Sequence, residues 1–66
     1  MIPKNAYIRL LVRERIIRIY KRKGADFNSY TREWQEYVQE IAWKSIYALA
    51  TAKGIGIQDA IDKLLP

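Results

Sequence analysis

Hydrophobic residues recur at helical intervals along most of the chain, and glycines divide this pattern into three segments. The first segment runs from about residue 5 to residue 23. Its apolar positions are spaced four, four and three residues apart, as on one face of a helix. These positions are Ile8, Val12, Ile16 and Ile19. Gly24 follows the cationic run KRK, which is typical of a helix C-terminus. The pattern therefore predicts an amphipathic helix that ends at about Lys23.

A second helix is predicted from about residue 29 to residue 53, with Asn28 or Ser29 as its N-terminal cap. A stripe of largely apolar residues follows this helix at intervals of three and four. The stripe comprises Tyr30, Trp34, Tyr37, Val38, Ile41, Ser45, Ala48, Leu49 and Ala52. We expect the stripe to face the core. The alternative for its three aromatic residues is a platform on which nucleic-acid bases stack.

The opposite face of the same helix changes character after Glu40. It is polar before this residue and apolar beyond it, at Trp43, Ile46, Tyr47 and Ala50. A helix that is apolar on all sides is covered on all sides, and a short chain offers little material for this. We therefore expect these four residues to form the interface of a homodimer. For Trp43 and Tyr47, packing against the first helix and docking of another protein are the alternatives.

The sequence KGIGI at residues 53–57 breaks the second helix, because Gly54 and Gly56 permit a tight turn. A short last helix is expected to follow, with Ile57, Ile61, Leu64 and Leu65 directed inward. The predicted fold class is thus all-α, with a long central helix between a moderate and a short one. Residues 1–66 are expected to form a single small helical domain.

Charge is unevenly distributed along the 66 residues, whose formal net charge is +5. Glu14 is the only acidic residue among residues 1–23. The basic residues of this segment are Lys4, Arg9, Arg13, Arg15, Arg18, Lys21, Arg22 and Lys23. Such segregation favours a polyanionic partner, and arginine binds phosphate with a planar fork. The alternatives are a solvated helix face and another acidic partner, such as an anionic membrane surface.

Residues suited to catalysis and metal binding are scarce. The sequence contains no His and no Cys, which commonly act as bases, nucleophiles and zinc ligands. Asp59 and Asp62 are three residues apart, as expected for a solvated helix face. The GIG sequence at residues 54–56 lacks the third glycine of a dinucleotide-binding loop. We therefore expect a protein that is not an enzyme and that uses no cofactor, no metal and no small-molecule substrate.

The sequence shows neither a leader peptide nor a membrane span. Its longest uncharged apolar run, residues 45–52, is far shorter than the roughly 20 residues that a spanning helix needs. We expect no membrane partner and a cytoplasmic location. A nucleoid-associated or viral location is the alternative.

Two stretches resemble the histone fold. RIYKRKGADFNS (residues 18–29) looks like the end of a histone first helix, its loop and the cap of the long helix. ALATAKGIGIQDAI (residues 48–61) looks like the second loop and the start of the last helix. The resemblance is to the small bacterial and archaeal type and covers about residues 16–65. It implies a histone-like, intertwined dimer that binds DNA.

The ribbon-helix-helix proteins, which are also basic DNA-binding dimers, are a second family with a similar pattern. AYIRLLV (residues 6–12) looks like their strand, with Ile8, Leu10 and Val12 directed inward. IIRIYKRKG and NSYTREWQEYV resemble their two helices. The sequence alone leaves open whether residues 6–12 are helix or strand.

Together these patterns predict a small basic dimeric DNA-binding protein, either architectural and chromatin-like or regulatory. Its phosphate contacts are expected from Arg9, Arg13, Arg15, Arg18, Lys21, Arg22 and Lys23. Double-stranded DNA is the expected ligand, although the sequence does not distinguish DNA from RNA. The alternative function is a non-catalytic protein–protein module, such as an adaptor, an inhibitor or a subunit of a ribonucleoprotein or viral assembly.

Overall fold

The computed structural model describes residues 4–66, and within this range it contains three α-helices, one 3-10 turn and no strand. Helix α1 spans Lys4–Arg22, the turn η1 spans Phe27–Ser29, α2 spans Arg32–Lys53 and α3 spans Ile57–Leu64. The all-α prediction is confirmed. Residues 6–12 belong to α1, so the strand considered for this segment is not formed.

Glycines in the left-handed region end the first two helices, as the sequence pattern indicated. Gly24 has φ 78° and Gly54 has φ 65°, values that glycine adopts without the steric cost of a side chain. Helix α2 begins later than predicted, because Thr31 rather than Asn28 or Ser29 is its cap. The Thr31 Oγ1 accepts a hydrogen bond of 3.1 Å from the Trp34 backbone N–H.

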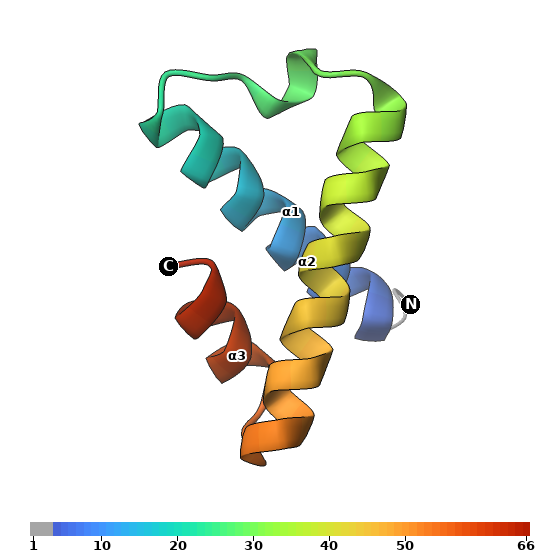
Figure 1. The fold of residues 1–66 in the computed structure, drawn as a ribbon, viewed down its shortest axis with the longest axis vertical. Helices are drawn as coiled ribbons and strands as arrows, with labels where there is room; N and C mark the ends of the chain where they lie inside the picture. Colours follow the sequence, from blue (N-terminus) through green and yellow to red (C-terminus); the bar gives the residue numbers. More distant parts are fainter. Residues whose placement is uncertain (1–3) are drawn as a thin grey trace.

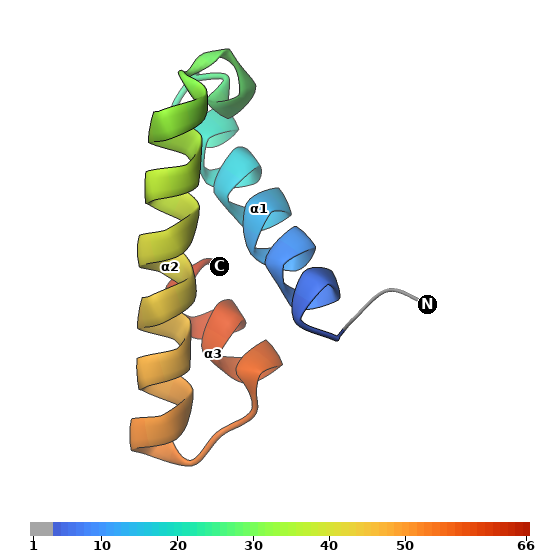
Figure 2. The same ribbon diagram turned by 90° about the vertical axis from the view of Figure 1, so that its right-hand side faces the viewer.

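Helix α2 is the longest element, and the other two helices lie against it (Figure 1). Helix α1 crosses α2 obliquely, and α3 turns back along the C-terminal half of α2. The view turned by 90° shows α3 in the space between α1 and α2 (Figure 2). The three helices therefore enclose a small core that follows one side of α2.

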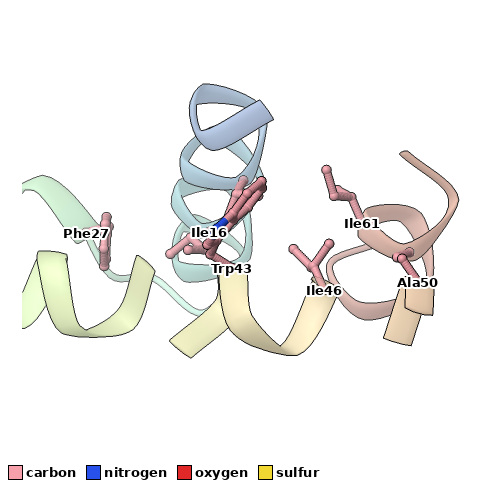
Figure 3. Close-up of a cluster of buried hydrophobic side chains, with 8 residues drawn as sticks. Ile16, Phe27, Trp43, Ile46, Ala50 and Ile61 are labelled. Carbon is pink, nitrogen blue, oxygen red and sulfur yellow. The ribbon is translucent and has the colours of Figure 1, made fainter. Parts of the chain in front are cut away.

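The buried side chains extend along this side of α2 in three groups (Figure 3). Phe27 of η1 lies within the connection between α1 and α2. Ile16 and Trp43 meet where α1 crosses α2, and Ile46 and Ala50 face Ile61 of α3. Among residues 6–66, the buried residues are Val12, Ile16, Phe27, Trp43, Ile46, Ala50, Ala60 and Ile61.

The structure corrects the prediction for Trp43, Ile46, Tyr47 and Ala50, which were expected on a face that the chain could not cover. Trp43, Ile46 and Ala50 are buried by residues of the same chain. Only Tyr47 is exposed, at 43%. The premise of the predicted interface was therefore wrong for three of the four residues, because α1 and α3 together supply the cover.

The other face of α2, which was predicted to be core, is largely exposed. We call the following residues the outer stripe: Tyr30, Trp34, Tyr37, Ile41, Ser45, Ala48 and Ala52, all of which are exposed. Val38 and Leu49, also predicted as core, pack partly buried beside it. In α3, Leu64 was predicted to face inward but is exposed. Ala60 is buried instead, together with Ile61, which was predicted correctly. The face of α2 that was predicted to be core is thus exposed, and most of the face that was predicted to remain uncovered by the chain is buried.

Candidate nucleic-acid interface

The seven basic residues predicted to contact phosphate separate into three groups on α1. Arg9 and Arg13 lie on the side that faces α2. The guanidinium carbon of Arg9 is 5.7 Å from the centre of the Trp43 ring. Arg13 donates to the Asn28 side chain and, at 3.1 Å, to Oε1 of Gln35. It also lies 5.6 Å from the Phe27 ring centre, within cation–π distance. Arg13 thus fastens the loop to both helices.

Arg15 connects α1 to α3. Its Nη2 lies 2.8 Å from Oδ1 of Asp62, and its Nη1 donates at 3.1 Å to the Leu65 backbone carbonyl. The Arg15 side chain is 23% exposed, which is low for an arginine of a small protein. Its charge is therefore partly neutralised and both of its terminal nitrogens contact α3 or the residue that follows it, so we assign this residue to the fold.

We expect the Arg15→Ala variant to lower the free energy of unfolding by about 1–2 kcal/mol, since it removes a charge-assisted hydrogen-bond pair between two helices. Urea unfolding followed by circular dichroism measures this loss. Arg32→Ala is the matched control, because Arg32 pairs with Glu36 at 3.8 Å with its side chain 90% exposed. Such a pair contributes little, and the control should change stability by less than about 0.5 kcal/mol. Equal effects of the two variants would contradict the structural role of Arg15.

The third group lies at the C-terminal end of α1 and in the residue that follows it. Arg18, Lys21, Arg22 and Lys23 make up this group, which we call the cationic end of α1. All four of these residues are exposed. Arg22 donates at 2.8 Å to the Pro66 backbone carbonyl. Within residues 4–66, the other three side chains make no ion pair or hydrogen bond. The cationic end thus concentrates four charges whose donors face solvent or a single carbonyl.

Aromatic rings form a second exposed feature near the loop. Tyr20 contacts Phe27 and Tyr30 edge to face, with ring centres 4.9 Å and 5.4 Å away. The series continues along α2 through Trp34 to Tyr37, which is 59% exposed. Helical periodicity placed Tyr30, Trp34 and Tyr37 on one stripe of the sequence. It did not reveal that these three residues are exposed, because that depends on how α1 crosses α2.

An apolar groove of about 340 Å³ adjoins the outer stripe. Trp34, Tyr37 and Ile41 form its outer wall, and Ile19 and Tyr20 of α1 form the facing wall. Among the residues that the structure describes, no charged one lines this groove. A second pocket of similar size, beside Trp43, has a mixed lining of Arg9, Glu36 and Glu40 with apolar and amide side chains. Among the described residues, no cluster of three or more Asp, Glu, His or Cys is placed to hold a metal.

The comparisons with known proteins found no matching family model, no similar curated protein and no similar solved structure. Among the helices of residues 4–66, none is both long enough and apolar enough to cross a membrane.

Proposed function

We propose that this protein binds nucleic acid, most readily double-stranded DNA, through phosphate contacts made by the cationic end of α1. The observation that supports this is the close grouping of Arg18, Lys21, Arg22 and Lys23 at one end of one helix. Affinity of this kind comes from charge neutralisation and counterion release. It is weakly dependent on base sequence, as expected of an architectural protein.

The proposal uses four of the seven basic residues. Arg13 and Arg15 use their donors on Asn28, Gln35, Asp62 and the Leu65 carbonyl, so we assign them to the fold. Arg9 lies over the Trp43 ring and does not belong to the cationic end. The proposed site is therefore smaller than the whole basic helix. Because it neutralises few phosphates, the affinity for nucleic acid should depend only moderately on salt concentration.

A matched pair of lysines tests the proposal. Lys21 and Lys53 are both exposed and both lie in the last turn of a helix, but only Lys21 belongs to the cationic end. We expect Lys21→Ala to weaken duplex binding by about three- to tenfold on every sequence, which corresponds to about 1 kcal/mol. The slope of log affinity against log salt should fall by about 0.9 for each phosphate that the variant no longer neutralises. Fluorescence anisotropy at several salt concentrations measures both.

Lys53→Ala removes the same charge at the far end of α2 and should leave affinity and salt slope nearly unchanged. If the two lysine variants behave alike, binding follows net charge alone and the proposed site is wrong. Parallel titrations with single-stranded DNA and structured RNA compare the ligand classes. A clear preference for single strands would point to the exposed aromatic rings as a stacking platform instead.

A further inference from the structure

The outer stripe has a regular order of large and small residues. From the loop toward Lys53, it presents Tyr30, Trp34, Tyr37 and Ile41, and then the small residues Ser45, Ala48 and Ala52. The intervals between successive positions are four, three, four, four, three and four residues, so their spacing is symmetric about Ile41. Every large aromatic residue therefore has a small residue at the same distance on the other side of Ile41.

We propose that the outer stripe is the interface of an antiparallel homodimer, in which two α2 helices pack face to face with a two-fold axis at Ile41. In this register Trp34 of one copy lies opposite Ala48 of the other. Tyr37 lies opposite Ser45, and Tyr30, just before α2, lies toward Ala52. Large side chains then fill the space left by small ones, as helix packing requires. A parallel pair would place Trp34 against Trp34 and leave the Ala48 end without side chains to fill it.

The charges of α2 favour the same orientation. Three glutamates and one arginine lie in residues 32–40, whereas residues 44–53 contain two lysines and no acid. An antiparallel pair brings the acidic half of each helix beside the basic half of the other. In this register Lys44 lies near Glu40 of the second copy, since the two positions differ by about 3 Å along the helix axis. A parallel pair would place acid beside acid, and like charges across an interface are unfavourable.

The exposed area suits a second copy of the chain. Tyr30, Trp34, Tyr37 and Ile41 are 41%, 42%, 59% and 48% exposed. With about 150–250 Å² of surface for each large side chain, roughly 400 Å² of these four is uncovered in each copy. Two copies contribute about 800 Å², which matches the apolar part of a standard interface of about 1,600 Å² in total. The uncharged groove beside the stripe extends this surface toward α1.

Single cysteine substitutions test the register directly, because the chain contains no cysteine of its own. With Ile41→Cys, the two introduced residues face each other across the two-fold axis. With Ser45→Cys, they are displaced by eight residues, or about 12 Å along the helix. A disulfide forms only when the Cα atoms lie within about 7 Å. We therefore expect Ile41→Cys to give a disulfide-linked dimer in a mild thiol–disulfide buffer, and Ser45→Cys to remain unlinked.

Equal cross-linking of both cysteine variants would indicate parallel helices and overturn the proposal. Absence of cross-linking in both would also overturn it, whether sedimentation shows the unmodified chain as a 7.8 kDa monomer or as a dimer through another surface. The experiment contains no nucleic acid, so its outcome is independent of the proposed binding function.

An exchange of the paired residues provides a second readout. Ala48→Trp places a second large ring opposite Trp34 of the other copy. It should weaken the dimer at least tenfold, as measured by sedimentation equilibrium. Combining it with Trp34→Ala restores one large and one small residue at each pairing, so the double variant should regain most of the affinity. Thr51→Trp adds the same bulk at an exposed position of α2 outside the stripe and is the control. Failure of the exchange to restore dimerisation would contradict the register.

Discussion

Replacing Phe27 by alanine should destabilise the protein more than any substitution on its surface. Phe27 is 0% exposed although it lies in the connection between two helices. Removing a buried phenylalanine costs about 3–5 kcal/mol through lost apolar burial and the cavity left behind. The total stability of a chain of this length is only about 3–10 kcal/mol. We expect the midpoint of urea unfolding, measured by circular dichroism, to fall strongly. The variant should be partly unfolded at 25 °C even without urea.

The size of this effect follows from the position of Phe27. It fills the space between α1 and α2 beside the loop, where Tyr20 contacts it edge to face. Phe27→Leu is the control, because it keeps most of the apolar volume and should cost less than about 1.5 kcal/mol. If Phe27→Ala behaves like the leucine variant, the loop does not contribute to the core and the described packing is wrong.

A second large loss of stability is expected from Trp43→Ala. Trp43 is 9% exposed and packs between α1 and α2, in the same group as Ile16. Truncation should lower the free energy of unfolding by about 3–5 kcal/mol, as measured by urea unfolding at several protein concentrations. This loss should not depend on protein concentration, because the residue is covered by its own chain.

Tyr47→Ala is the appropriate comparison for Trp43→Ala. The two rings touch edge to face with centres 4.7 Å apart, but Tyr47 is 43% exposed. Removing the Tyr47 ring should cost about 1 kcal/mol. If instead both variants cost the same and both effects vanish on dilution, Trp43 and Tyr47 would belong to an interface between chains, as the periodicity of the sequence indicates.

The ends of the helices were predictable from the sequence because they depend on local chemistry. A glycine in the left-handed region terminates a helix wherever the rest of the chain lies, as Gly24 and Gly54 do. The start of α2 was less accurate, since several neighbouring residues can cap a helix. Asp26 accepts a hydrogen bond from the Asn28 N–H and starts η1 instead, which moves the cap of α2 to Thr31.

The buried face of α2 was not predictable in the same way, because the helix is apolar on both faces beyond Glu40. Periodicity shows that residues share a face, but the choice between two apolar faces depends on where α1 and α3 pack. Similarly, the abundance of basic residues on α1 was visible, whereas the pairing of Arg15 with Asp62 was not. These two residues are far apart in the sequence, and only the docking of α3 brings them to 2.8 Å.

The two faces of α2 each carry one tryptophan, and these are the only two in the chain. Trp43 is enclosed between helices, while Trp34 is 42% exposed on the outer stripe and donates its indole N–H to the Tyr20 hydroxyl at 3.3 Å. Because indole emission moves to shorter wavelengths as water is excluded, each ring acts as an intrinsic fluorophore for a different event. The emission of Trp43 follows the packing of the core, and that of Trp34 follows the covering of the stripe. Two single-tryptophan variants, Trp34→Phe and Trp43→Phe, each keep a large apolar ring at the replaced position, so that the first records folding and the second records association without an added dye.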